Sequence, residues 1–359
     1  MLPILFELAL PGPAALALAL AAVAALAVAR AVSFRRELAR GGRSLSFGAA
    51  LWDDKLTVGA LLVAVAVGWR AGVFAGTVRL PLHSYGLAMA TAFLVGIQVA
   101  QRLAKRDGLD PERVGDLAFW IVIAALVGSR LYFIAVNWDD YFGAGASVET
   151  ALGRIPRLVA IWEGGLVFYG GFLGAVAVSV WYMRRHRMPF LRYADALIPS
   201  VALGHFFGRL GCFGAGCCWG GVSHSHLPWL TRFPPASLAY QTFAARPNAA
   251  ELLAPDQLTT LPVHPTQLYE SFGELGLFLA LVFLVRPRRS FHGQVLATWL
   301  LCYAVLRSLV EVFRGDLERG VVAGFGVGQW TSVVIFAAGA ALLAWGRRQS
   351  VGARAEPAI

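Results

Sequence analysis

Long apolar stretches recur from one end of this chain to the other, with short polar segments between them. A helix that crosses a bilayer needs about 20 mostly apolar residues, and about nine stretches satisfy that length. Hydrophobic residues make up 58% of the chain and charged residues only 14%, which excludes a single soluble core. The sequence therefore predicts an all-α integral membrane protein. Its expected spans are residues 10–32, 55–77, 84–103, 115–137, 161–183, 193–213, 267–285, 293–313 and 326–346.

Basic residues are dense in every second loop and sparse in the loops between. The dense clusters lie near residues 35–43, 102–113, 184–192, 286–289 and 347–354. Because cytoplasmic loops carry the excess of Lys and Arg, we expect the N-terminus outside and the C-terminus in the cytoplasm. The net charge of +10 is thus a topology signal. Nucleic-acid binding would require one contiguous basic face, which is absent from this pattern.

The spans suggest a division of the chain into unequal parts. Residues 1–80 are expected to form a two-helix membrane extension, whose first span is a retained anchor because no basic segment precedes it. Residues 81–349 are expected to form the main membrane core, and residues 350–359 a cytoplasmic tail. Within the core, the proline-rich loop 214–266 faces outward and predicts an irregular cap.

Ionisable and phenolic side chains inside the apolar spans gather at their outer ends. Such groups are costly in hydrocarbon and mark functional sites by default. One arginine alone could equally snorkel to the interface or lock a helix in an ion pair. The outer group comprises Tyr85, Arg130, Tyr169, Arg209, Glu270, Glu274, Arg307, Glu311 and Arg314, whereas Asp195 lies at an inner end.

Tyr303, Arg307 and Glu311 follow one another at intervals of four residues, so they share one face of a helix. A guanidinium group presents a planar fork that suits a phosphate. With Arg209 at the same depth, this face predicts a site for an anionic phospholipid headgroup. A purely structural Arg307–Glu311 pair is the alternative.

Residues 204–221 read GHFFGRLGCFGAGCCWGG. The glycines are expected to break the helix beside Arg209, where irregular backbone must be buried in protein or line a wet cavity. Cys212, Cys217 and Cys218 have three open interpretations. They pack or form a disulfide, they supply a catalytic thiol beside Arg209, or they bind a metal with His224 and His226. No recognised spacing of metal ligands supports the third.

Six segments of the chain resemble successive segments of the prolipoprotein diacylglyceryl transferases, in the family's order. They are HSYGLAMATAFLVG at 83–96, GSRLYF at 128–133, EGGLVFYGGFLGA at 163–175, YADALIPSVALGHFFGRLGCF at 193–213, HPTQLYES at 264–271 and YAVLRSLVEVFRGD at 303–316. The resemblance covers about residues 82–346 and implies a seven-helix core, with the first two spans additional.

The resemblance implies transfer of a diacylglyceryl group from phosphatidylglycerol to the lipobox cysteine of a prolipoprotein, at the outer face of the bacterial inner membrane and without a metal or cofactor. The implied catalytic residues are Arg307, Glu311, Tyr303 and Tyr169. The implied substrate-binding residues are Arg209, Tyr85, Gly164, Gly165, Arg130, Gly220, Glu270 and Arg314. Phosphatidylglycerol, membrane lipid and prolipoprotein signal peptides are the expected partners.

Three positions depart from the family pattern. Tyr169 stands where the family usually has histidine, Cys212 where it has asparagine, and Cys217 where it has an acidic residue. These changes are consistent with a distinct cysteine-containing branch of the family. A related transferase with another acceptor and a non-catalytic lipid-binding protein are therefore alternative functions. The one-sided depth of the polar residues argues against an alternating-access transporter.

Overall fold

The computed structural model of the protein describes residues 4–40, 62–63, 65–66, 69, 77–142, 158, 165–315, 321–322 and 325–355. Its contacts divide the chain into a smaller unit, Ile4–His83, and a larger unit that contains Ser84–Ile359. Among the described residues, six helices are long and apolar enough to cross a membrane. The predicted class of integral membrane protein is therefore confirmed.

The described residues of the smaller unit include one long helix and one pair of strands. Strand β1 (Ile4–Pro11) pairs antiparallel with β2 (Thr77–His83), with Leu8 opposite Leu80. Helix α1 (Gly12–Arg40) follows β1 directly and contains all but the first two residues of the first predicted span, which lie in β1. The pattern of apolar residues did not reveal the strands, because short apolar runs suit a strand and a buried helix equally. The second predicted span, 55–77, falls largely outside the described residues.

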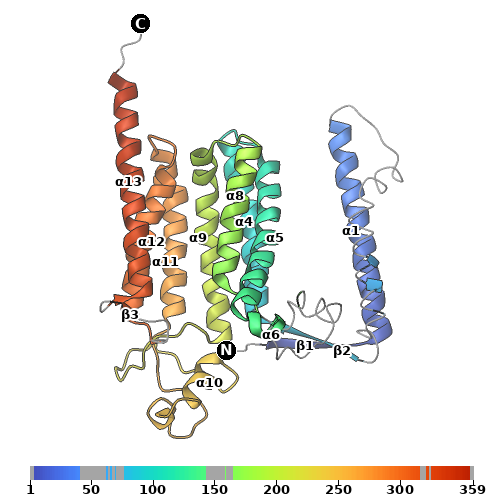
Figure 1. Ribbon diagram of the computed structural model, residues 1–359, viewed down its shortest axis with the longest axis vertical. Helices are drawn as coiled ribbons and strands as arrows, with labels where there is room; N and C mark the ends of the chain where they lie inside the picture. Colours follow the sequence, from blue (N-terminus) through green and yellow to red (C-terminus); the bar gives the residue numbers. More distant parts are fainter. Residues whose placement is uncertain are drawn as a thin grey trace. The chain divides into compact units, whose positions relative to one another are not determined.

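Long helices of alternating direction make up the larger unit (Figure 1). Each matches one predicted span, although α8 begins at Phe168 and not near residue 161, because the backbone of Val167 just before it is extended. Short α6 (Trp138–Phe142) follows α5, and strands β3 (Val321–Val322) and β4 (Phe325–Gly326) precede α13. The long helices are α4 (Ser84–Arg106), α5 (Pro111–Val136), α8 (Phe168–Arg185), α9 (Phe190–Ala215), α11 (Thr266–Ala280), α12 (Gln294–Val312) and α13 (Val327–Ala355).

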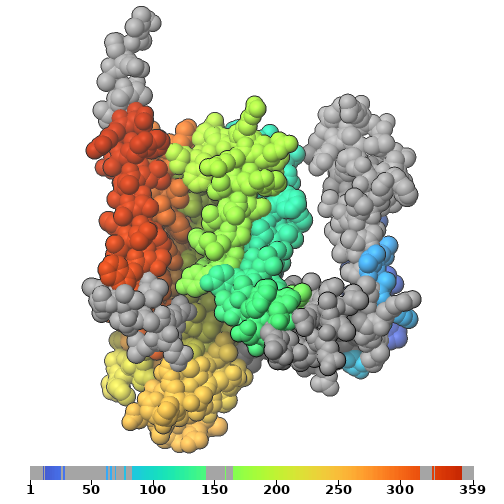
Figure 2. All heavy atoms as spheres, viewed as in Figure 1, coloured from blue at the N-terminus to red at the C-terminus, as the bar shows by residue number. Residues whose placement is uncertain are grey.

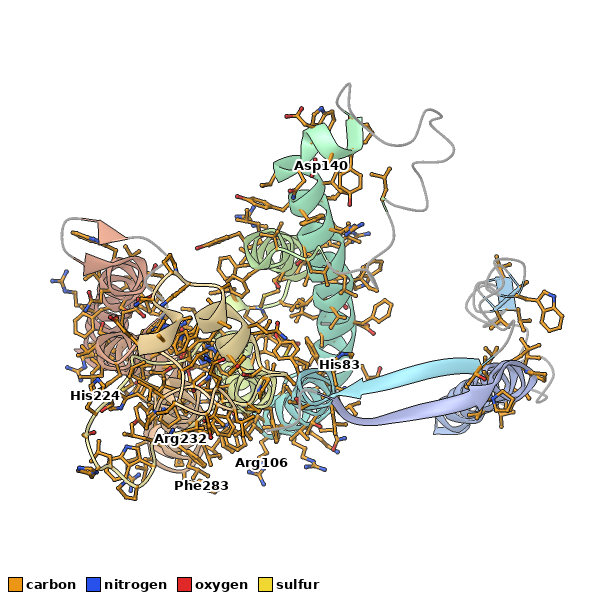
Figure 3. All side chains as sticks on the ribbon, turned by 90° about the horizontal axis from the view of Figure 1, so that it is seen from below. His83, Arg106, Asp140, His224, Arg232 and Phe283 are labelled. Carbon is orange, nitrogen blue, oxygen red and sulfur yellow. The ribbon has the colours of Figure 1, made fainter. Side chains whose placement is uncertain are left out.

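Three pairs of these helices pack most extensively: α4 with α9, α5 with α8, and α12 with α13, while α11 also packs against α9. Helix α11 continues through a π turn at Leu281–Val285 and a 3-10 turn at Arg286–Arg288. Large apolar side chains remain exposed on the outside of the helices, as expected for a surface in contact with lipid. Phe283, which Figure 3 labels, is 65% exposed.

Glycine allows helices α5 and α8 to approach closely. A Cβ atom placed on Gly170 would overlap the backbone carbonyl of Gly128 and the side chain of Tyr132. Small residues at such contacts let helix backbones pack together in a bilayer, where no hydrophobic effect drives the helices to associate.

We expect Gly170→Ala to destabilise the protein by about 1–3 kcal/mol, since neither backbone can yield without separating the helices. Gly276→Ala is the matched control, because a Cβ there meets nothing within 4 Å. Thermal unfolding of both variants in detergent, followed by tryptophan fluorescence, measures the difference. Equal melting temperatures would show that α5 and α8 are not held at this contact.

An irregular cap, residues 216–265, joins α9 to α11 at one end of the bundle (Figures 1 and 2). It contains α10 (Leu238–Ala244) and a 3-10 turn at Ala249–Glu251. The cap has its own apolar core around Trp219, Phe233 and Phe243. The predicted irregular cap thus exists, and it is a packed structure.

The opposite end of the bundle is held by buried carboxylates. Asp107 accepts hydrogen bonds from both terminal nitrogens of Arg289, at 2.9 and 2.7 Å, and lies 2.8 Å from Arg286. Asp195 accepts from the backbone N–H groups that begin α12. Two arginines of a predicted loop cluster therefore form specific ion pairs, in addition to any role in topology.

Candidate active site

Arg209 and Glu270 form a buried ion pair near the cap end of the bundle. Arg209 lies in the last two turns of α9, and Glu270 lies in the first two turns of α11. The Nη2 atom of Arg209 donates to Oε1 of Glu270 at 2.8 Å, and the two side chains are 15% and 1% exposed. Among the described residues, the buried Nε of Arg209 and Oε2 of Glu270 have no hydrogen-bond partner. One donor and one acceptor of this buried pair are therefore not satisfied by the described protein groups.

A second carboxylate extends the network toward α12. Glu274 lies one turn after Glu270, and its Oε1 is 2.9 Å from Nδ1 of His205. Nε2 of His205 lies 3.8 Å from Glu270, so this imidazole connects the two acids. Trp299 donates through Nε1 to Oε2 of Glu274 at 3.3 Å, and its indole stacks on the ring of Tyr303. Three helices thus share one polar network.

Tyr303 lies near both of the predicted phosphate-binding arginines. Its phenol group is within electrostatic range of both Arg209 and Arg307. Nη1 of Arg307 lies 2.6 Å from Oε2 of Glu311, although the two atoms are not aligned as a hydrogen bond. Arg314 approaches the same oxygen to 3.9 Å. The face predicted from the four-residue spacing therefore exists, and it adjoins the Arg209–Glu270 pair.

The three neighbouring cysteines converge where α9 ends. The Sγ atoms of Cys212, Cys217 and Cys218 all lie within 4.8 Å of one another, and each is a thiol. Hydrogen bonds from the thiols of Cys212 and Cys217 lower the pKa of Cys218, with help from Arg209 and Arg314. The same hydrogen bonding raises the pKa of Cys217. One thiolate in the cluster is therefore stabilised.

Residues of α4 and α11 border the cysteines. Tyr85, in the first turn of α4, is 44% exposed and lies within electrostatic range of all three thiols and of Arg209. Gln267 donates to the carbonyl of Cys217 at 2.6 Å, and Thr266 donates to the carbonyl of Cys218 at 2.8 Å. The cap backbone is thereby fixed to α11.

Arg130 has a different environment from Arg209 and Arg307. It is buried in α5 and donates to the carbonyls of Leu158 and Gly165 and to the hydroxyl of Tyr141. Gly165 has a φ of +72°, and a Cβ there would lie 2.6 Å from Nη1 of Arg130. These contacts fix the chain that leads into α8. Tyr169, on α8, has a 61% exposed ring.

Two predicted glycines remain. Gly220 has a role in backbone packing, and Gly164 is not among the described residues. Gly220 donates to the carbonyl of His264 at 3.0 Å and bridges to Arg314. A Cβ on Gly220 would overlap the carbonyls of His264 and Phe313, so close backbone packing requires glycine there.

Sequence reasoning did not identify the roles of several residues. His205, which sequence reasoning did not assign to the site, contacts both buried acids. Its position one turn before Arg209 was the available signal. Trp299 had no such signal, since a tryptophan in an apolar helix is unremarkable. His224 and His226 are not part of the thiol cluster, which contains cysteines alone.

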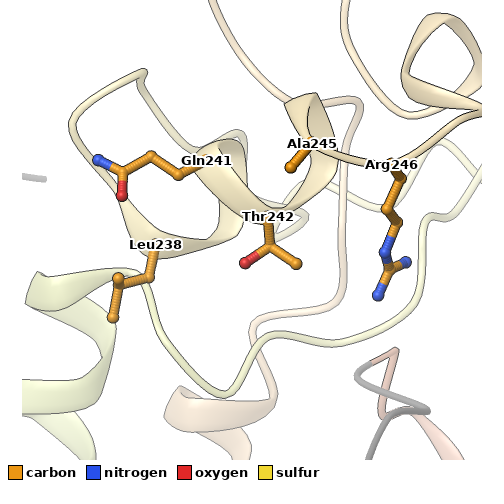
Figure 4. Close-up of a pocket in the computed structure, with 5 residues that line it drawn as sticks. All are labelled: Leu238, Gln241, Thr242, Ala245 and Arg246. Carbon is orange, nitrogen blue, oxygen red and sulfur yellow. The ribbon is translucent and has the colours of Figure 1, made fainter. Parts of the chain in front are cut away.

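Two cavities lie away from this network. One, of about 410 Å³, is bordered by α10 residues and Arg246 in the cap (Figure 4). The other, of about 390 Å³, is an apolar groove between α12 and α13, bordered by Cys302 and Phe336 among others. Neither is lined by Arg209 or Arg307. The charged network therefore lies apart from both cavities.

Comparisons with known proteins identify the family to which the chain belongs. The family model of the prolipoprotein diacylglyceryl transferases matches residues 73–345. A phosphatidylglycerol–prolipoprotein diacylglyceryl transferase of Thermosynechococcus vestitus is 34% identical over 236 residues, which cover 66% of this chain and 78% of the relative. Relatives of the same name from Synechococcus elongatus and Burkholderia thailandensis are each 32% identical, over 78% and 77% of this chain and 89% and 94% of their own length. This chain belongs to the prolipoprotein diacylglyceryl transferase family.

Proposed function

We propose that this protein transfers a diacylglyceryl group from phosphatidylglycerol to the lipobox cysteine of prolipoproteins in the bacterial inner membrane. Family membership and the names of the relatives support the reaction. The observation that carries the assignment of the site is the buried Arg209, which keeps an unpaired Nε next to Glu270. Such a donor at the headgroup level suits an anionic lipid phosphate.

Arg209 and Arg307 are proposed to bind the phosphate and to neutralise the glycerol phosphate that departs. Charge develops on the leaving oxygen in the transition state, so preorganised guanidinium groups lower the barrier. Glu270 orients Arg209, and Glu311 orients Arg307, because each carboxylate is already paired with its arginine. Arg314 adds positive charge next to Glu311.

The phenol groups are assigned hydrogen-bonding roles. Tyr303 lies within range of both arginines and is proposed to donate to the phosphate. Tyr85 is proposed to contact the headgroup, and Tyr169 to donate from the exposed face of α8. The remaining assigned binding residues act through the backbone near α8 and the cap; they are Arg130, Gly164, Gly165 and Gly220.

The topology proposed from the basic loops puts the cap at the outer face of the inner membrane. The cap joins the helix ends that carry the polar network, whereas Arg286 and Arg289 are at the other end. A headgroup site at the cap end suits an acceptor cysteine on a signal peptide in the same membrane. Residues 1–80 are proposed to form a membrane extension of the 81–349 core, with residues 350–359 as a cytoplasmic tail.

Complementation tests the function directly. In bacteria depleted of their own transferase, expression of the chain is expected to restore diacylglyceryl-modified prolipoprotein, detected by mass spectrometry of the lipobox peptide. Membrane insertion is checked on the same cells. Inserted protein with no modified peptide contradicts the proposal. Binding of phosphatidylglycerol without transfer would then indicate a lipid-binding protein, and a lipidated product other than prolipoprotein would indicate another acceptor.

A further inference from the structure

The thiol cluster of Cys212, Cys217 and Cys218 has no role in the binding of the lipid phosphate described above. Its three sulfur atoms converge within 4.8 Å. We propose that these cysteines bind a zinc ion as three thiolates, with one coordination position left open. This metal site would lie beside Arg209, and it is separate from the groups that are proposed to bind the lipid headgroup.

The geometry of the cluster suits the ion. Tetrahedral zinc bonds to sulfur are about 2.3 Å long, which puts the sulfurs about 3.8 Å apart. The sulfur atoms now lie within 4.8 Å of one another, so each distance between them must shorten by ~1 Å or less. Rotation of the cysteine side chains supplies a movement of that size. Thiolates are also the ligands that zinc prefers among soft donors.

The backbone already holds the cysteines in position. Cys218 has a φ of +59°, a conformation that residues other than glycine rarely adopt. Hydrogen bonds from Gln267 and Thr266 to the carbonyls of Cys217 and Cys218 maintain it. Backbone strain that the surrounding structure maintains is concentrated at functional sites.

Neighbouring charges offset those of the bound site. Zinc with three thiolates has a net charge of −1, which is costly where the surroundings are apolar. Arg209 interacts electrostatically with Cys212 and Cys218, and Arg314 with Cys218. The two guanidinium groups therefore stabilise an anionic zinc–thiolate cluster.

The open coordination position could be used in the transfer reaction, and this part of the inference rests on the proposed function. Zinc sites with three protein ligands accept a further ligand, whereas closed sites have four. No histidine or carboxylate of the described residues joins this cluster. The acceptor cysteine of the prolipoprotein is proposed to take the fourth position, because a thiol bound to zinc loses its proton at neutral pH.

In the transfer, the acceptor thiol releases its proton to solvent. Its sulfur forms a bond to the carbon of the diacylglyceryl group that is esterified to the phosphate of phosphatidylglycerol. The bond from that carbon to the phosphate oxygen breaks, and the electron pair leaves with glycerol phosphate beside Arg209. No electrons are exchanged with any other reagent.

Metal analysis of the full-length protein, purified in detergent, tests the site itself. We expect about one zinc ion per chain and, after exchange with cobalt, the absorption bands of a tetrahedral thiolate complex. Cys217→Ser is expected to lose both. Cys302→Ser, which changes the thiol on α12 outside the cluster, is expected to keep both. A disulfide between any two of the three cysteines, with no zinc bound, would overturn the proposal.

Thiol protection covers the case in which Cys217→Ser fails to fold. In the wild-type protein, zinc is expected to slow maleimide labelling of the three clustered cysteines and to leave Cys302 unaffected. Unchanged labelling rates contradict the site.

A lipobox peptide tests the open position. Its single cysteine should alter the cobalt spectrum, and the serine version should not; identical spectra would remove the acceptor from the metal. Transfer by a protein that binds no metal overturns this inference and leaves the proposed function intact. Zinc binding by a protein that shows no transfer would contradict the proposed function and leave the metal site itself intact.

Discussion

We expect Arg209→Lys to lower the rate of diacylglyceryl transfer by about 100-fold, equivalent to ~2.7 kcal/mol of transition-state stabilisation. Lysine keeps the positive charge, so it still pairs with the buried Glu270 and the fold is retained. It cannot, however, contact Glu270 and a phosphate oxygen at once through a planar fork. The loss of rate therefore measures the contribution of the guanidinium N–H groups that do not bind Glu270, including the unpaired Nε of Arg209.

The measurement is the initial rate of peptide modification in proteoliposomes that contain phosphatidylglycerol. Arg288→Lys is the matched control, because Arg288 lies in the 3-10 turn that follows α11, at the opposite end of the bundle from Arg209, and donates to the nearby carbonyl of Leu284. We expect that control to retain the wild-type rate. A rate for Arg209→Lys within about threefold of wild type, which corresponds to less than 1 kcal/mol, would remove Arg209 from the reaction.

Asp195→Ala is expected to give the largest loss of stability, about 3 kcal/mol or more. The carboxylate is fully buried and accepts three backbone N–H groups, from Gly293, Val295 and Leu296, at 2.8, 3.0 and 3.1 Å. Alanine leaves these donors without partners, and each buried orphan costs about 1–3 kcal/mol. The apparent Tm in detergent should fall by roughly 4 °C or more.

Asp110→Ala provides the comparison. Asp110 also caps a helix, but it is exposed; it accepts the N–H of Glu112 at 2.9 Å and lies 3.2 Å from the guanidinium group of Arg113. An exposed cap of this kind contributes about 1 kcal/mol. If the two variants melt at the same temperature, the connection from α9 to the start of α12 does not stabilise the bundle.

The helices were predictable because each depends on a local property, the apolar content of about 20 residues. Spans such as 193–213 and 293–313 match α9 and α12 within three residues at each end. The pairing of β1 with β2 was not predictable. It joins residues at opposite ends of an 80-residue segment, and the composition of neither strand specifies the partner.

Part of the active site was predictable for a similar reason. Tyr303, Arg307 and Glu311 are neighbours on one helix, so their spacing alone shows that they share a face. Arg209 and Glu270 come from different helices, and only the packing of α9 against α11 shows that they pair. The two acidic partners of His205 are both on α11, so these contacts also depend on the packing of α9 against α11.

The sequence by itself determined that this protein crosses a membrane, where its helices lie, and which charged residues bear an unusual energetic cost. Those conclusions follow from transfer free energies and helical periodicity, which are properties of short segments. Only the tertiary structure decided which charges neutralise one another, that Arg130 is occupied by backbone carbonyls, and that three cysteines meet at the end of α9. Such contacts join segments far apart in the chain, and local sequence carries no record of which distant groups the packing brings together.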